Sequence, residues 1–269
     1  NAICGPTRAS LLTGLYCQQV GHSGRHWNQP KDFNRCVTVA ELLQAAGYRT
    51  MMVGKWQGRD PAVERGFDRF FGPMCQGMVS YFDEVQLNPF YLDGARWPVP
   101  QDDFFMTEAF IDHAAGFVEE AAGGKRPFFL YVAHLAPHWP LHARPAEIAA
   151  YRDTYREQGW QQRRQQRFQR QRQMGVIPKS WSLSPKPAAV PLWEEDPHKP
   201  WQAERMAVYA AQVSGVDRGV GRIMAAIKSA GVEENTLVMF LSDNGAAPNG
   251  GVTPSSSGFG FGPDGKKDN

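Results

Sequence analysis

Apolar residues follow two alternating patterns along this chain. In some segments they recur every three or four residues, the spacing of one face of an α-helix. In others they form short continuous runs bounded by glycine, proline or asparagine. The helical spacing predicts helices over residues 6–16, 38–48, 103–122 and 201–230. The continuous runs predict buried strands over residues 48–55, 126–134 and 235–245. Helices that alternate with buried strands predict an α/β fold, with a mainly parallel sheet sandwiched by helices.

Two stretches depart from this alternation. Residues 152–172 are crowded with arginine and glutamine, as in "QQRRQQRFQRQRQ". They are either an arm that binds nucleic acid or a solvated helix on an excursion from the sheet. We favour the solvated helix because the stretch lacks interleaved aromatic residues and the whole chain has a balanced charge. Residues 180–200 are rich in proline and serine and predict a long surface loop.

Composition limits the classes of protein to which the chain can belong. It has 269 residues, 42% of them hydrophobic, and a formal net charge of +2, which argues against strong binding to nucleic acid or an anionic membrane. No apolar run reaches the roughly 18–20 residues that span a bilayer. The cysteines are Cys4, Cys17, Cys36 and Cys75. They form no CxxC pair, which disfavours a zinc ribbon and leaves one or two disulfides open. Because the chain starts at Asn1 rather than methionine, we expect both ends to be cuts in a longer protein.

The stretch "ICGPTRASLLTGLY" places Cys4 at the start of a predicted helix, with Arg8 one turn later. A helix N-terminus favours an anion by about 0.3–1 kcal/mol, and a guanidinium on the same face can contact that anion. On this spacing alone three interpretations are open: a buried structural cysteine, a reactive thiolate, and a cysteine destined for modification.

A longer pattern adds to this picture. Cys4, Pro6, Arg8, Thr13 and Gly14 form C-x-P-x-R-x-x-x-x-T-G, which resembles the signature of the Cys-type sulfatases in the alkaline phosphatase-like superfamily. "GYRTMMVGKWQ", "GFDRFFG", "FFLYVAHLAPHWP" and "FLSDNGA" resemble further elements of that family in the expected order. The resemblance implies an alkaline phosphatase-like α/β fold truncated at both ends. Residues 1–269 would then be an N-terminal catalytic domain that lacks its first strand and its C-terminal part.

The resemblance also implies a chemistry. A separate formylglycine-generating enzyme would oxidise Cys4 to Cα-formylglycine, and the hydrated aldehyde would carry two hydroxyls on one carbon. One hydroxyl attacks the sulfur of a sulfate ester and the alcohol leaves. The other hydroxyl then loses its proton, so that sulfate departs and the aldehyde reforms.

Several further side chains receive roles from the same resemblance. Arg8 would steady the hydrated aldehyde, and Lys55 would contact both the aldehyde and the sulfate. His138 would contact the sulfate ester and help the leaving oxygen. We expect His134 and His142, which lie nearby in the sequence, to be structural.

Asp243 and Asn244 directly follow the apolar run "TLVMFLS" of the last predicted strand. A carboxylate and an amide oxygen there suit a hard cation, although an Asx turn at Asn-Gly explains the same pair. The resemblance favours a divalent metal, most readily Ca²⁺ with Mg²⁺ as the second choice, and adds the modified Cys4 as a ligand. Because parallel strands bring their carboxyl ends to one edge, Lys55, His138 and Asp243 are expected to converge there.

The sequence departs from the family pattern at Gln57, which stands where the family has histidine in "GKWH". An amide can bind sulfate but cannot exchange a proton, and loss of one general acid or base costs about 10²–10⁴-fold in rate. The family's acidic pair would lie before Asn1, and its second active-site lysine beyond Asn269. We therefore expect this chain to bind metal weakly and to be inactive or nearly so by itself.

The sequence thus predicts a sulfuric ester hydrolase, arylsulfatase-like, that acts on a small-molecule or glycan sulfate ester. Two alternatives remain open. A phosphonate or phosphate monoester hydrolase of the same superfamily would share the C-x-P-x-R element, and a non-catalytic sulfate-ester-binding fragment would be consistent with Gln57. The resemblance implies a periplasmic or secreted location, and we expect neither nucleic acid nor a membrane span among the partners.

Overall fold

The computed structural model describes residues 3–21, 33–58, 60–74, 80–82, 89–188 and 190–245. The chain divides into two compact units, Asn1–Pro140 with Ser214–Asn249, and Leu141–Val213 with Gly250–Asn269. The grouping of residues 1–269 into one catalytic domain stays a prediction.

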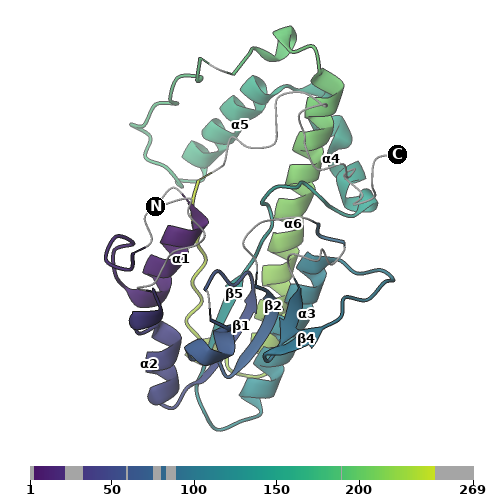
Figure 1. The fold of residues 1–269 in the computed structure, drawn as a ribbon. Coiled ribbons are helices and arrows are strands. Elements are labelled where there is room, and N and C mark those ends of the chain that lie inside the picture. Colours follow the sequence, from purple (N-terminus) through teal and green to yellow (C-terminus); the bar gives the residue numbers. More distant parts are fainter. Residues whose placement is uncertain are drawn as a thin grey trace. The chain divides into compact units, whose positions relative to one another are not determined.

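The first unit is built on a five-stranded sheet (Figure 1). Its strands are β1 (Arg49–Gly54), β2 (Arg69–Pro73), β3 (Phe90–Leu92), β4 (Ala95–Trp97) and β5 (Phe128–Ala133). The order across the sheet is β4-β3-β2-β1-β5, with β1 parallel to both β2 and β5. This parallel core confirms the predicted strands at 48–55 and 126–134. An antiparallel hairpin of β3 and β4 extends the sheet beyond β2 and was not predicted.

Helices cover both faces of this sheet, as the sequence predicted (Figure 1). They are α1 (Cys4–Thr13) and α2 (Val39–Ala45) on one face, and α3 (Met106–Ala122) with residues 214–229 of α6 (Lys199–Ser229) on the other. The strand β1 shows why both faces are apolar, since Met52 packs in the core with α1 and α2, whereas Met51 and Val53 pack with α3. No helix in the described ranges is both long enough and apolar enough to cross a membrane.

The helix ends follow local rules that bear on the site. The helix α1 begins at Cys4, two residues before the predicted start, and ends before Gly14, whose φ of 69° is left-handed. Thr38 caps α2, because its hydroxyl accepts from the Glu41 amide while the Glu41 carboxylate accepts from the Thr38 amide.

The second unit contains α4 (Pro145–Glu157), α5 (Trp160–Gln173) and the first part of α6. A small core of Ala143, Ile148, Ala207, Val208 and Ala211 holds α4 against α6. The helix α5 buries no residue, which confirms a solvated helix for residues 160–172, whereas residues 152–157 of the predicted stretch belong to α4. Residues 180–200 are largely irregular, as predicted, except for a short 3₁₀ helix at Trp193–Glu195 and the start of α6.

The strand predicted at 235–245 is wrong for this structure. A 3₁₀ turn (Glu233–Asn235) is followed by residues 236–241, which belong to no strand, and Leu237 and Phe240 are 83% and 76% exposed. An extended apolar run becomes a strand only where a neighbour supplies backbone hydrogen bonds. The sheet order ends at β5, and residues 236–241 form no ladder with a described strand.

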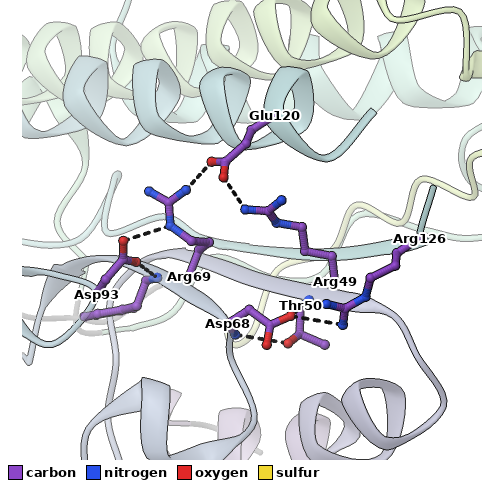
Figure 2. A network of polar contacts seen from close by, with 8 residues as sticks. Arg49, Thr50, Asp68, Arg69, Asp93, Glu120 and Arg126 are labelled. Atoms are coloured by element: carbon purple, nitrogen blue, oxygen red, sulfur yellow. Dashed lines mark hydrogen bonds and ion pairs between the residues drawn. The ribbon is translucent and has the colours of Figure 1, made fainter. Parts of the chain in front are cut away.

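A polar network ties the amino ends of the parallel strands together (Figure 2). Glu120 of α3 pairs with Arg49 at the start of β1 and with Arg69 at the start of β2. Arg69 also donates to Asp93 at 2.8 Å. The Glu120 side chain is 42% exposed, so each pair contributes only about 0–1 kcal/mol. This end of the sheet is therefore structural, and the candidate chemistry lies at the opposite, carboxyl end.

Candidate active site

The site is positioned where β1 and β5 end side by side. The Lys55 amide donates to the Ala133 carbonyl at 2.9 Å, directly after β1. Gly54 has a φ of 108°, and a Cβ built on it would lie 2.2 Å from the Ala133 oxygen. A Cβ on Gly72 would lie 2.1 Å from the Gly54 oxygen. Only glycine permits these close approaches, which bring Lys55 to the carboxyl edge of the sheet.

Two nitrogen donors face the sulfur of Cys4. Lys55 Nζ lies 3.5 Å and Gln57 Nε2 lies 3.4 Å from Cys4 Sγ. Lys55 is only 3% exposed, so its charge is poorly solvated. The helix α1 has no side-chain cap, and its first backbone hydrogen bond runs from Thr7 to Ile3. The amides of its first turn therefore add to the positive potential around Cys4.

Arg8 connects three segments around this sulfur. Its Nε pairs with Asp243 Oδ2 at 2.9 Å, and its two terminal nitrogens donate to the carbonyls of Lys55 (3.3 Å) and His134 (3.2 Å). Burial opposes the charge of Arg8, but Tyr131 and Asp243 outweigh burial and raise its pKa. Arg8 thus remains a cation, and its donors fix the ends of β1 and β5 relative to Asp243.

His138 presents a neutral ring to the same charges. Its Nδ1 lies 2.6 Å from the Trp139 carbonyl, and the Tyr81 hydroxyl donates to the His138 carbonyl at 3.0 Å. Desolvation is the main cause that lowers the pKa of His138. The positive charge of Lys55 lowers this pKa further, while the Trp139 carbonyl and Asp243 oppose the shift. With Nδ1 directed at the carbonyl, Nε2 is the ring atom that can exchange a proton with a ligand.

The other two histidines differ in their surroundings. Both ring nitrogens of His134 are buried and have no hydrogen-bond partner among the described residues. Burial, with a smaller effect of Arg8, lowers the pKa of His134 to about 4, so its ring is neutral at pH 7. His142 is buried and belongs to the second unit. Their structural assignment stays a prediction.

Asp243 and Asn244 do not by themselves complete a metal site. The Asp243 carboxylate is paired with Arg8, and the Asn244 side chain donates to the Gly245 carbonyl at 2.8 Å. The described residues contain no group of three or more His, Cys, Asp or Glu side chains that could hold a metal. Ca²⁺ takes six to eight oxygen ligands, and one carboxylate shared with a guanidinium does not fit that requirement.

Three of the four cysteines lie among the residues that the structure describes. No disulfide joins Cys4, Cys17 and Cys36, the cysteines that the structure describes. Cys75, Lys266 and Lys267 lie outside the described residues.

Sequence reasoning missed Tyr131, which contacts Arg8 from β5. A signal for it was present, because Tyr131 lies two residues after Phe129 and therefore on the same face of the strand. That face packs in the core that also contains Ala9 and Leu12 of α1.

The chain is similar to proteins of one family along nearly its whole length. The family model described as Sulfatase matches residues 1–267. An arylsulfatase from Klebsiella aerogenes is 33% identical over 266 residues, which cover 90% of this chain and 56% of that protein. The N-acetylgalactosamine-6-sulfatase of Canis lupus familiaris is 27% identical over 273 residues, covering 92% of this chain and 42% of that protein. The chain thus spans about half the length of the curated relatives it matches.

Solved structures give the same fold. The crystal structure of Ps i-CgsB in complex with k-i-k-neocarrahexaose has 25% sequence identity and a TM-score of 0.57, over 84% of this chain and 45% of that one. A Bacteroides thetaiotaomicron protein designated BT33494S-sulf has a TM-score of 0.60 at 18% identity, over 87% of this chain and 48% of that one. The predicted α/β fold is therefore confirmed.

Proposed function

The chain belongs to the sulfatase family, and on this premise we propose that it is the catalytic part of a sulfuric ester hydrolase. The net reaction converts a sulfate ester and water into an alcohol and sulfate. The observation that supports this most directly is the position of Cys4 Sγ, 3.5 Å from Lys55 Nζ and 3.4 Å from Gln57 Nε2. A helix N-terminus, an ammonium and an amide donor together suit a tetrahedral oxyanion held beside residue 4.

The proposal includes conversion of Cys4 to Cα-formylglycine by a separate enzyme. The sulfur in the present structure then stands in for the hydroxyl oxygens of the hydrated aldehyde. Lys55 is placed to donate to one of these oxygens and to an oxygen of the bound sulfate. Arg8 acts indirectly, because its donors bind the Lys55 carbonyl and Asp243 and so hold Lys55 in position.

The chemistry proceeds in two balanced steps. One hydroxyl of the hydrated aldehyde gives its proton to solvent water and its oxygen attacks sulfur. The bond from sulfur to the ester oxygen breaks, and His138, protonated at Nε2 for this step, gives that proton to the leaving alcohol oxygen. The second hydroxyl then gives its proton to the neutral His138, which restores the acid, and the carbon–oxygen bond to the sulfate breaks. Sulfate departs, the aldehyde reforms, and water hydrates it for the next cycle.

The proposal includes weak binding of a divalent cation, Ca²⁺ or Mg²⁺, but no catalytic step that depends on it. Asp243 and Asn244, with the modified residue 4, are its candidate ligands. They carry one formal negative charge, which Arg8 already neutralises. We expect this chain to bind Ca²⁺ weakly, and calorimetry that found an affinity equal to that of a full-length sulfatase would contradict this ligand count.

Peptide mass spectrometry around residue 4 tests the mechanism. Conversion of the cysteine to formylglycine lowers the peptide mass by about 18 Da in protein from the native host. Hydrolysis of an aryl sulfate should be lost in Cys4→Ala and retained in Cys36→Ala, a matched change at another cysteine outside any described disulfide. An unmodified thiol at residue 4 in active protein would refute the mechanism.

The relatives support a small-molecule or glycan sulfate ester as the substrate. Two of them are an arylsulfatase and an N-acetylgalactosamine-6-sulfatase. The donors around Cys4 would also accept a phosphonate or phosphate monoester. Turnover of an aryl sulfate and an aryl phosphonate with the same leaving group separates these reactions, and the proposal requires the sulfate to be preferred.

A further inference from the structure

The helix α5 and the loop that follows it form the most strongly charged surface of the second unit. Residues 158–193 carry five arginines and two lysines and no aspartate or glutamate. The whole chain has a net charge of only +2, so positive charge is concentrated in this segment. The helix buries none of its residues, and its arginines therefore contribute nothing to a core.

Three of the arginines are held in place by uncharged partners. Arg163 donates to the Thr154 carbonyl at 2.5 Å, Arg164 to the Ser184 carbonyl at 2.6 Å, and Arg172 donates at 2.6 Å to a loop carbonyl. None of the five arginines of α5 pairs with a carboxylate in the described part of the chain. These charges are therefore partly ordered and yet not neutralised.

The other two arginines, Arg167 and Arg170, are exposed and have no hydrogen-bond or ion-pair partner among the described residues. They lie three positions apart, so they are neighbours on the helix surface. Arg170 also borders a hollow of about 860 Å³ beside α5.

Amide side chains line most of this hollow. Gln162, Gln166, Gln169 and Gln173 follow each other at intervals of three or four residues, and all four border the hollow from one face of α5. An amide both donates and accepts hydrogen bonds, which suits hydroxyl groups, whereas a guanidinium suits a sulfate or carboxylate. Phe168 adds a single aromatic ring.

We propose that this surface, defined by Arg167, Arg170 and the four glutamines, binds a linear sulfated polysaccharide. Repeated sulfates would contact the arginines, and sugar hydroxyls would contact the glutamines. The choice of a sulfated polymer rests on the proposed function, whereas the binding of a polyanion rests on the surface alone. Sites for single-stranded nucleic acid use several aromatic rings for stacking, and this hollow offers one. A membrane surface would require an apolar stripe, which α5 lacks.

Binding of dextran sulfate, with unsulfated dextran as the negative probe, tests the proposal. We expect Arg167→Gln/Arg170→Gln to weaken binding of dextran sulfate about tenfold or more, and to reduce the slope of log K against log salt by about one to two. The control Arg156→Gln/Arg222→Gln removes the same charge from two exposed arginines on α4 and α6 and should change binding less than about threefold. An equal loss in both double variants would overturn the proposal, because net charge alone would then explain binding.

Two further measurements separate this inference from the proposed reaction. Hydrolysis of a small aryl sulfate should be the same in Arg167→Gln/Arg170→Gln and wild type, while KM for a sulfated polymer rises at unchanged kcat. If residue 4 is unmodified but dextran sulfate still binds, the proposed reaction is refuted and the proposed binding surface is supported. If a single-stranded DNA of matched charge binds as tightly as dextran sulfate, the assignment to a sulfated polysaccharide is wrong.

Discussion

Lys55 and Gln57 contact the same sulfur, but they differ in charge, and this difference predicts unequal losses on truncation. Lys55 Nζ and Gln57 Nε2 lie at 3.5 and 3.4 Å from Cys4 Sγ, so distance does not separate them. Lys55 brings a buried positive charge, whereas Gln57 brings a neutral amide whose Oε1 is buried without a hydrogen-bond partner in the described structure. The change to alanine therefore removes a hydrogen bond from a charged donor in one case and a neutral hydrogen bond in the other.

The magnitudes follow from the strength of the two contacts. A hydrogen bond to a charged group contributes about 1.5–3 kcal/mol, which is roughly 10- to 150-fold in rate if it acts in the transition state. A neutral hydrogen bond contributes about 0.5–1.5 kcal/mol, or roughly 2- to 13-fold. We expect kcat/KM for an aryl sulfate to fall in Lys55→Ala by about ten times more than in Gln57→Ala.

The assay is steady-state hydrolysis of an aryl sulfate by the longest available form of the protein. Rates are divided by the fraction of residue 4 that is converted to formylglycine, since either substitution could alter that conversion. Lys125→Ala, at an exposed lysine before β5, serves as the control and should match wild type. An equal or greater loss in Gln57→Ala would refute the argument from charge and give the amide a primary role.

Three further outcomes are expected. Gly54→Ala should lower the free energy of unfolding by more than Gly14→Ala, measured by urea denaturation, because both positions have positive φ but only Gly54 would clash with a backbone oxygen; strain alone costs about 1–3 kcal/mol. Equal losses would show that the clash is relieved. His134 should cost wild type about 1.5 kcal/mol of stability between pH 6.5 and pH 5, since its folded-state pKa lies near 4 and below its unfolded value, and the unfolded chain alone then takes up the proton. His134→Leu should lose less over the same range, and an unchanged slope would contradict the assignment. His138→Ala should reduce kcat/KM far more for an alkyl sulfate than for 4-nitrophenyl sulfate, by up to about 10²–10⁴-fold, because only a poor leaving group needs the proton. For the alkyl ester, kcat/KM should fall as pH rises through a pKa below 6.5, the lowered pKa of His138. Equal losses for both esters would exclude His138 as the acid.

The parts of the fold that the sequence predicted are those set by local pattern. The strands β1 and β5 are continuous apolar runs, and α1 is marked by Pro6 in its first turn and by Gly14 at its end. The hairpin β3–β4 was missed, although its turn is Asp93-Gly94, a pair typical of two-residue hairpin turns. Its strands have only three residues each, which is too short for a period of two to stand out.

Residues 236–241 show the opposite failure. "TLVMFL" has the composition of a buried strand, yet strand formation depends on a partner elsewhere in the chain. Composition carries no information on whether that partner is present. The prediction failed at an apolar run that forms no ladder with the described sheet, whose order ends at β5.

Arg8 shows which contacts in the site could not be predicted from the sequence. Its spacing from Cys4 predicted a guanidinium near residue 4, because both residues lie on one helix. Its actual partners are 47, 126 and 235 residues away in the sequence, at the Lys55 carbonyl, the His134 carbonyl and Asp243. No local pattern contains those contacts, since they exist only after β1 and β5 have paired. The fork of Arg8 donors therefore does more than face an anion: it holds the strand ends that present Lys55, and the geometry at residue 4 depends on contacts that only the folded chain creates.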